Sequence, residues 1–382
     1  MLCGLAINGW AILPGYYGAR SLSLGYASTG YNYDLNAMFI NPALLANVEY
    51  TLTGYQYQNS YMDYKHFEEN LENILNYDLK NFQSLQDNEK TSAMNTLKSI
   101  YGDKTGMYGF SSSFPGFVSK NVGVSVSWVN TGVMNPITTG TETIFNKDPQ
   151  NVTNEDITAL KMNFMGLKYK QITLAYALSM NTINFGIAVH YLNGKISEFE
   201  QSITESPFNS STGTKDYLEY GWKQASKKFS RVVSDIGVSV QLGQYFTAGL
   251  VMKNFGNAKI QTPVREIKLD KRVTAGLSFR PNTQLGLYLD MDIKRSDFTY
   301  SGKEMQPISF GIEKGFFKNK LIIRGGMLND LAEKQFLGKK SNVLYGLGLG
   351  FNMNWVIMDM GIGLNSRGDI KSLAISGFFL IK

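Results

Sequence analysis

Residues 283–294 read TQLGLYLDMDIK, and this stretch decides the fold class. Leu285, Leu287, Leu289, Met291 and Ile293 alternate with glycine, tyrosine, aspartate and lysine. A period of two is typical of a β-strand whose two faces meet different surroundings. Because an apolar face lies opposite a face of glycines and charges, the pattern favours a strand with one face in lipid and the other in a polar lumen.

Similar alternation recurs along the chain, and the links between the alternating segments are short and long in turn. An even number of strands with alternating turns and loops is typical of bacterial outer-membrane barrels, whereas a Greek-key sandwich has no reason to alternate. We therefore predict an all-β fold, a transmembrane antiparallel up-and-down β-barrel of about 14 strands, with both termini periplasmic. The predicted strands are 50–57, 107–114, 121–130, 166–179, 182–195, 229–242, 244–255, 271–280, 283–294, 306–316, 319–328, 342–352, 354–364 and 371–381.

Composition excludes several other classes of protein. No apolar run reaches the roughly 18 residues that a membrane-spanning helix needs. With 2 His and 1 Cys, the chain cannot build most metal sites or a disulfide framework, so we expect no metal and no cofactor. The formal charge of +6 is modest for 382 residues and does not indicate nucleic-acid binding. Residues 1–11 are apolar and uncharged, as in the end of a leader peptide.

The long link 58–106 has a helical pattern. Apolar residues at three- and four-residue spacing predict an amphipathic helix over 64–85 and a shorter one over 89–100. The apolar face either packs on the barrel rim as a lid or forms an external landing site that captures a hydrophobic ligand. The capture residues would be Phe67, Leu71, Ile74 and Phe82.

Residues 18–46, GARSLSLGYASTGYNYDLNAMFINPALLA, resemble the N-terminal signature of the FadL-type hydrophobic-compound transporters and the related PorV/PorQ outer-membrane proteins. The resemblance implies a fourteen-stranded barrel over 49–382 whose lumen holds residues 12–48 as a hatch. The implied hatch and gating residues are Arg20, Asp34, Asn36, Asn41, Pro42 and Ala43.

Charged residues on the predicted lumenal faces carry mixed signs, and isolated charges in a narrow lumen must pair or stay hydrated. We expect an internal network that grips the hatch; an ion-selective pore is the alternative. These residues are Lys253, Arg280, Asp290, Asp292, Glu313, Arg324 and Asp359. His190 also falls on a lumenal face, but the sequence shows no partner that would make it a catalytic base. We therefore do not expect the protein to be an enzyme.

Together with the resemblance, these patterns predict that the protein is an outer-membrane channel for passive uptake of hydrophobic or amphipathic small molecules such as long-chain fatty acids. The alternative is a PorV/PorQ-like secretion component that binds secreted protein cargo through its external loops, and a third option is a porin-like structural protein. Expected partners are outer-membrane lipid and lipopolysaccharide together with the solute or cargo. The link 196–228, which ends in Lys227 and Lys228, is either a solvated loop or a contact for lipopolysaccharide or cargo.

Overall fold

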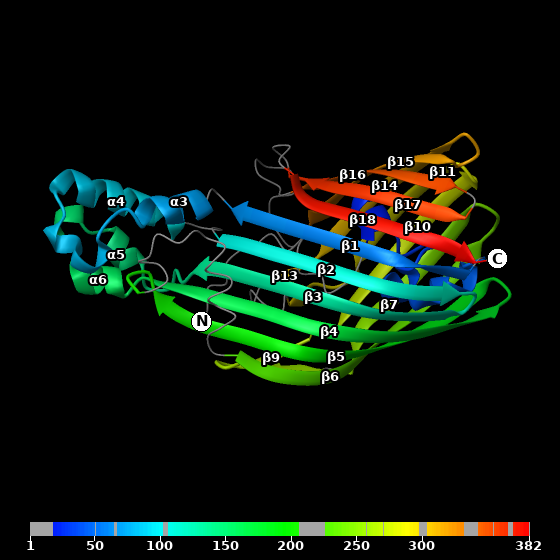
Figure 1. Ribbon diagram of the computed structural model, residues 1–382, viewed down its shortest axis with the longest axis horizontal. Helices are drawn as coiled ribbons and strands as arrows, with labels where there is room; N and C mark the ends of the chain where they lie inside the picture. Colours follow the sequence, from blue (N-terminus) through cyan, green and yellow to red (C-terminus); the bar gives the residue numbers. More distant parts are fainter. Residues whose placement is uncertain are drawn as a thin grey trace.

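The computed structural model describes residues 18–49, 51–64, 67–101, 106–205, 226–256, 258–269, 271–297, 304–331, 343–353, 355–365 and 370–381. Over these residues the chain forms a closed barrel of fourteen antiparallel strands in up-and-down order (Figure 1). The barrel strands are β1 (Thr51–Tyr64), β2 (Gly106–Ser119), β3 (Val122–Pro136), β4 (Lys161–Met180), β5 (Ile183–Ser202), β6 (Ser226–Leu242), β7 (Phe246–Phe255), β10 (Arg272–Asn282), β11 (Leu285–Asp292), β14 (Pro307–Phe316), β15 (Leu321–Asp330), β16 (Leu344–Met353), β17 (Val356–Leu364) and β18 (Ile370–Ile381). The predicted leader, residues 1–11, lies outside the described residues.

Pairing of the first strand with the last closes the barrel. Strands β1 and β18 pair in antiparallel register from Thr51 opposite Ile381 to Ser60 opposite Ser372. Closure gives the backbone groups of both strands partners, so neither strand remains a free edge. The predicted fold class is confirmed, and each of the fourteen predicted strands overlaps one barrel strand.

The barrel has apolar side chains outside and charged side chains inside. On β11, Leu289 and Met291 are 44% and 39% exposed, whereas Asp290 and Asp292 are 5% and 1% exposed. This is the reverse of a water-soluble protein, where an aspartate faces solvent and a leucine is buried. No helix in the described part of the chain is long and apolar enough to cross a membrane.

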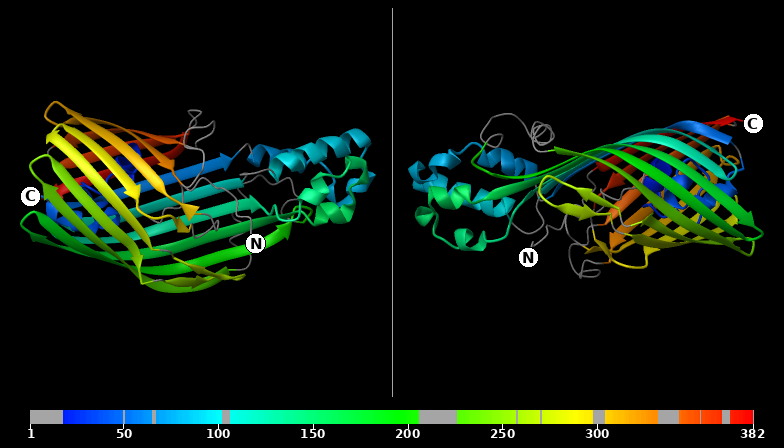
Figure 2. Two further views of the ribbon diagram at one scale, coloured as in Figure 1. Left: turned by 180° about the vertical axis from the view of Figure 1, so that it is seen from behind. Right: turned by 90° about the horizontal axis from the view of Figure 1, so that it is seen from below.

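Strands β4 and β5 have twenty residues each and extend well beyond the apolar band of the outer surface. At their far end, opposite the C-terminal end of β18, lies a helical body that we call the cap, formed by residues 67–101 and 137–160 (Figures 1 and 2). Its elements are α3 (Phe67–Ile74), η2 (Leu79–Ser84), α4 (Asp87–Ile100), α5 (Glu142–Phe145), η3 (Pro149–Asn151) and α6 (Asn154–Thr158). Two small hairpins lie in other long links: β8 (Lys259–Gln261) with β9 (Glu266–Lys268), and β12 (Ser296–Asp297) with β13 (Glu304–Met305).

The cap has a hydrophobic core of its own. The four predicted capture residues, Phe67, Leu71, Ile74 and Phe82, are fully buried in it. They pack with apolar residues of α4 and with α5 and α6, which belong to a different link. In this structure they therefore build a core and do not form an exposed landing surface, because each apolar helix face meets another one within the cap. The predicted helix over 64–85 is also shorter, since α3 ends at Ile74 and a 3₁₀ helix follows.

We expect Phe82→Ala to destabilise the cap selectively. Loss of a fully buried Phe ring costs about 3–5 kcal/mol, so the amides of α4 should exchange with deuterium much faster while those of β14–β18 keep their protection. The neighbouring Gln83 has an exposed side chain and supplies the matched control, Gln83→Ala. Unchanged exchange in α4 of Phe82→Ala would contradict this view of the cap.

Candidate functional site

Residues 18–49, which we call the hatch segment, cross the lumen of the barrel from one wall to the opposite one. Its elements are α1 (Gly18–Ser23), α2 (Ala37–Ile40) and the 3₁₀ helix η1 (Pro42–Asn47). Helix α1 contacts β15–β18 and β1, and η1 contacts β4, β5 and β6. Almost all of its residues from Gly18 to Leu45 are buried, so they occupy the space inside the barrel.

Glycines on the inward faces of the strands make room for this segment. A Cβ on Gly186 would lie 2.2 Å from the backbone nitrogen of Ala43, and one on Gly237 would lie 1.9 Å from Asn41 Oδ1. On the opposite wall, a Cβ on Gly346 would lie 2.1 Å from the carbonyl oxygen of Leu22. At these three positions the close approach of the hatch segment leaves no room for a side chain on the barrel wall.

Asn41, Pro42 and Ala43 form the start of η1 and tie it to the wall. The Asn41 Oδ1 accepts a hydrogen bond from the Ala43 backbone N–H (3.1 Å), and Pro42 occupies the first turn. The Asn41 amide also donates to the carbonyl oxygens of Thr29 and of Val238 on β6, each at 3.2 Å. One side chain thus caps a helix, fixes a second part of the hatch segment and contacts the barrel.

Arg20 enters an ionic cluster on the other wall, which we call the charge clamp: Arg20, Glu313, Arg324 and Asp359. Glu313 accepts hydrogen bonds from Arg20 Nε (3.1 Å) and Arg324 Nε (2.7 Å), and Arg324 also donates to Asp359 at 2.5 Å. Two guanidinium groups and two carboxylates balance, so the buried cluster carries no formal net charge. Tyr288 completes it by accepting from Arg20 and donating to Glu313.

Asp34 and Asn36 shape the middle of the hatch segment. The Asp34 carboxylate accepts a hydrogen bond from the backbone N–H of Asn36 (2.7 Å), and the Asn36 side chain donates to Gln56 of β1 (3.1 Å). Burial raises the pKa of Asp34 to about 6, although the nearby Arg20 acts in the opposite direction. Its contacts make Asp34 a turn-forming residue of the hatch segment, and Asn36 joins that turn to the wall.

Three of the four remaining predicted lumenal residues contact the hatch segment. Asp290 accepts from the backbone N–H groups of Ser28 and Thr29, each at 2.8 Å. Lys253 donates to the Phe39 carbonyl oxygen (2.6 Å), and the Arg280 guanidinium lies 4.1 Å from the centre of the Tyr31 ring. Asp292 instead pairs with Arg272 and Thr274 of the wall.

His190 has a partner that sequence reasoning missed. Its Nε2 lies 3.3 Å from Asp235 on β6, and its Nδ1 lies 2.9 Å from the Thr173 hydroxyl. The Phe39 ring stacks on the imidazole with 6.2 Å between ring centroids, so the group is closed off from the rest of the lumen. Asp235 could have been suspected because it also falls on an inward face, but only the register of β5 and β6 brings the two together.

The two sides of the lumen differ in chemistry. The inward faces of β2–β6 supply most of the apolar wall, and Met38, Phe39 and Ile40 of α2 belong to the same hydrophobic cluster. Hairpin β8–β9 adds Ile260 and Ile267 to this cluster. The charge clamp lies on the opposite side, where α1 packs. The apolar wall residues of β2–β6 are Phe114, Val118, Val129, Val133, Met165, Leu167, Ala175, Ala177, Ala188, Leu192, Ile196, Phe229 and Val233.

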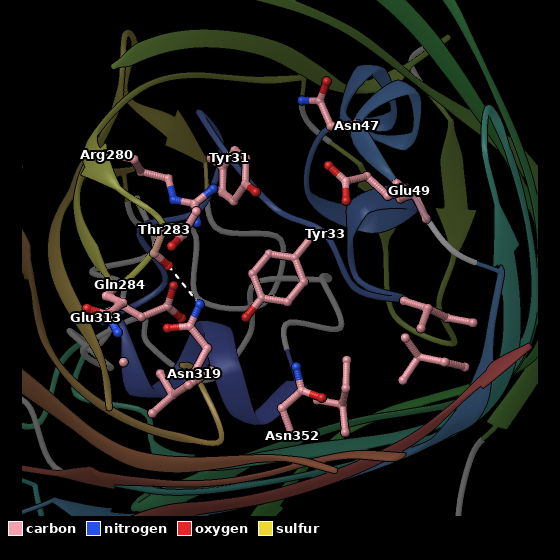
Figure 3. A pocket seen from close by; sticks show the side chains of 16 residues that line it. Tyr31, Tyr33, Asn47, Glu49, Arg280, Thr283, Gln284, Glu313, Asn319 and Asn352 are labelled. Atoms are coloured by element: carbon pink, nitrogen blue, oxygen red, sulfur yellow. Dashed lines mark hydrogen bonds between the residues drawn. The ribbon is translucent and has the colours of Figure 1, made fainter. Parts of the chain in front are cut away.

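A cavity of about 320 Å³ opens at the short-turn end of the barrel. Figure 3 shows Tyr33 in its middle, with Arg280 and Tyr31 on one side and Asn47 and Glu49 on the other. Its apolar lining comes from Val48, Leu52, Ile322, Ile357 and Leu380. A much smaller cavity, of about 20 Å³, lies beside Lys253, Arg272 and Asp290. The lumen is therefore plugged in the middle and hollow at the turn end.

Comparison with protein families gives a match over residues 38–292, two thirds of the chain, to the family described as F plasmid transfer operon, TraF, protein. The chain belongs to this TraF family. Among curated proteins, no sequence matches it significantly. The matched range runs from α2 through β11, so it includes the cap and the six long strands β1–β6.

Solved structures show the fold that this TraF-family chain adopts. The CymD monoaromatic hydrocarbon channel aligns with a TM-score of 0.56 at 9% identity, over 97% of this chain and 99% of that one. The Ralstonia pickettii toluene transporter TbuX gives 0.54 at 11% identity, over 97% and 100%. The P. putida toluene transporter TodX gives 0.51 at 10% identity, over 96% and 97%. The fold of FadL-type channels, expected from the resemblance, is confirmed, although the sequence family is TraF.

We expect Gly186→Ala to loosen the hatch segment, because the added methyl group must push the backbone of Pro42 and Ala43 away from β5. Overpacking of this kind costs about 1–3 kcal/mol, so the amides of residues 41–45 should exchange with deuterium faster. Gly377→Ala is the matched control, since a Cβ there meets no atom within 4 Å. Equal exchange in the two variants would show that the contact at Gly186 does not hold η1.

We expect Glu313→Gln to break the charge clamp. The change leaves Arg20 and Arg324 close together without their shared carboxylate, and breaking a buried ion pair costs about 3–5 kcal/mol. The midpoint of guanidinium unfolding should fall, and the amides of α1 should exchange faster. Glu266→Gln breaks an exposed pair with Lys259 and should cost less than about 1 kcal/mol. A similar small loss at Glu313 would mean that the cluster does not anchor α1.

Proposed function

We propose that this protein is an outer-membrane channel for passive passage of hydrophobic or amphipathic small molecules. The observation that carries the proposal is the apolar wall of β2–β6, which is covered by a separate segment of the chain and not by fixed wall side chains. A water-filled pore has a polar lumen and gains nothing from such a wall. An apolar solute that replaces the hatch along this wall leaves water at a gain of about 25 cal/mol per Å².

The contacts of the hatch segment suggest how a path would open. Helix α1 is anchored by the charge clamp, whose partners have fixed geometry. Helix α2 and η1 are held by apolar packing, by Asn41 and by the Lys253 contact. A solute competes with apolar packing more readily than with an ion pair. The predicted hatch, residues 12–48, would then hinge near α1 and move at α2 and η1; its residues 12–17 lie outside the described residues.

The route runs from the cap side to the periplasmic side. The solute enters beside hairpin β8–β9, where Ile260 and Ile267 join the apolar wall, and passes Phe39 once α2 has moved. It then reaches the cavity at the short-turn end, whose 320 Å³ falls within the range of small-molecule sites. In this orientation the C-terminal end of β18 is periplasmic, and we propose the same side for the N-terminus, which lies outside the described residues. No covalent step is involved, so the protein is not an enzyme.

The substrate class follows from the chemistry of the two ends of this route. The apolar wall accepts any hydrocarbon part, and the cavity adds Arg280, Tyr33 and Asn47 for a polar end group. Monoaromatic hydrocarbons and long-chain fatty acids both satisfy the first requirement, and only the fatty acids use the second. Both classes of solute therefore belong in the uptake test.

Locking the hatch to the wall should stop passage. An ideal Cβ on Gly123 of β3 lies 3.3 Å from Met38 Cβ of α2, close to disulfide geometry, so Met38→Cys with Gly123→Cys joins the two. With the native Cys3 replaced by Ser, oxidised cells should take up toluene and oleate no faster than cells lacking the protein, and a reductant should restore uptake. Each single-cysteine variant serves as a control. Undiminished uptake in the oxidised double variant would overturn the proposal.

The cap favours a second candidate, an envelope component that binds a protein partner outside the membrane. The cap has its own core, lies beyond the barrel end and carries ten acidic and four basic residues, a net charge of −6 in a chain of +6. Its family description names a plasmid transfer operon, which accords with a role beside other proteins. A cap deletion that keeps uptake but loses a co-purifying protein, together with uptake unchanged by the hatch lock, would favour this function.

A further inference from the structure

Three lysines lie side by side on the outer surface of the longest strands. Lys168 on β4 pairs directly with Lys195 on β5, and Lys195 pairs with Lys228 on β6. All three side chains are exposed and point away from the lumen, as do Ile172, Tyr191 and Val232, four residues further toward the short turns. We call these three residues the lysine row. The sequence pattern predicted a loop at Lys228, whereas β6 already begins at Ser226.

The lysine row has a defined position relative to the apolar band. The last outward apolar row on these strands is Ile172, Tyr191 and Val232, which also pair with one another. The lysine row lies four residues beyond it on every strand, about 13 Å along the strand direction. Tyr191 and the exposed Trp128 on β3 are the aromatic side chains expected at a membrane–water boundary. The lysines therefore lie at the level of lipid headgroups.

Placing three lysines side by side has an electrostatic cost. Like charges directly opposite each other on neighbouring strands repel, at a Cβ separation of about 5 Å. Lysines often protect free sheet edges, but at Lys168 and Lys195 the strands β4 and β5 pair on both sides, so edge protection does not explain these two lysines. At Lys228, β6 pairs with β5 but not with β7, whose pairing with β6 begins at Ser234. An anion bound across the row removes the repulsion. Lys170, one row nearer the apolar band, adds a fourth positive charge on the same face.

We propose that the lysine row binds the phosphate groups of a phosphorylated glycolipid, the lipid A part of lipopolysaccharide in the outer leaflet. The acyl chains of that lipid pack against Ile172, Tyr191 and Val232, and its phosphates reach the ammonium groups above them. The inference rests on the outer-membrane location in the proposed function but not on passage of a solute. It also gives the barrel a fixed depth in the membrane, with the acidic cap held beyond the headgroups.

Native mass spectrometry of the detergent-purified full chain tests this site. The chain is titrated separately with bisphosphorylated lipid A, with its dephosphorylated form and with phosphatidylglycerol. We expect the phosphorylated form to bind about tenfold or more tightly than the dephosphorylated one, because each lysine near an anionic headgroup adds attraction. The variant K168Q/K195Q/K228Q should lose this preference. The matched control K120Q/K318Q/K320Q removes three exposed lysines at the short-turn end and should keep it.

Three results would overturn the proposal. The wild-type chain could bind both forms of lipid A equally, both triple variants could lose affinity to the same extent, or phosphatidylglycerol could bind as tightly as lipid A. Uptake of toluene by cells that produce K168Q/K195Q/K228Q distinguishes failure of the lipid-binding proposal from failure of the proposed channel function. Because the lysine row lies outside the lumen, uptake should stay at the wild-type rate whether or not the lipid binds.

Discussion

Everything in this molecule depends on each strand having one face in an apolar solvent and the other in an enclosed polar interior. In lipid, no water satisfies the backbone, so the sheet must close and every strand must pair on both sides. The pairing of β1 with β18 meets that condition. Once the barrel is closed, Asp290 and Asp292 can be buried on the same strand that exposes Leu289 and Met291. Closure thus places ionised groups where only the hatch segment and one another can satisfy them.

The filling of the lumen follows from that constraint. Buried charges are tolerated only when they are matched, and the charge clamp meets this with two guanidinium groups against two carboxylates. The wall of β2–β6 packs apolar residues against α2, beside buried polar groups such as Gln171, Thr173 and His190. Glycines such as Gly186 and Gly346 let the backbone of the hatch segment approach both walls. The hatch segment is consequently held by ion pairs at α1 and mainly by apolar packing at α2.

The barrel could be predicted from sequence because a period of two is strictly enforced where one face meets lipid. Beyond the lipid the constraint ends, and there the prediction fell short: β4 and β5 continue for several residues past their predicted ends at 166 and 195. The amphipathic pattern of α3 could not show whether Phe67 meets a ligand or another helix, because burial depends on α5 and α6 from a distant link. Likewise, the inward positions of Glu313 and Arg324 were predictable, but their pairing with Arg20 depends on where the hatch segment lies.

The family match covers a smaller part of the molecule than the fold match. The TraF family model covers residues 38–292, which hold the cap, the long strands and the lysine row, whereas Glu313, Arg324 and Asp359 of the charge clamp lie outside it. The fold match covers nearly the whole barrel, plug included. The cap core includes residues at the cap ends of β3 and β4 but no residue of the hatch segment, so it is built without the plug. A barrel that needs only its lumen for passage has no use for strands twenty residues long. The extra length of β4 and β5 brings Met162, Phe164 and Phe199 to the cap core. The cap core and the packing around the hatch segment are therefore two separate hydrophobic clusters on one closed sheet.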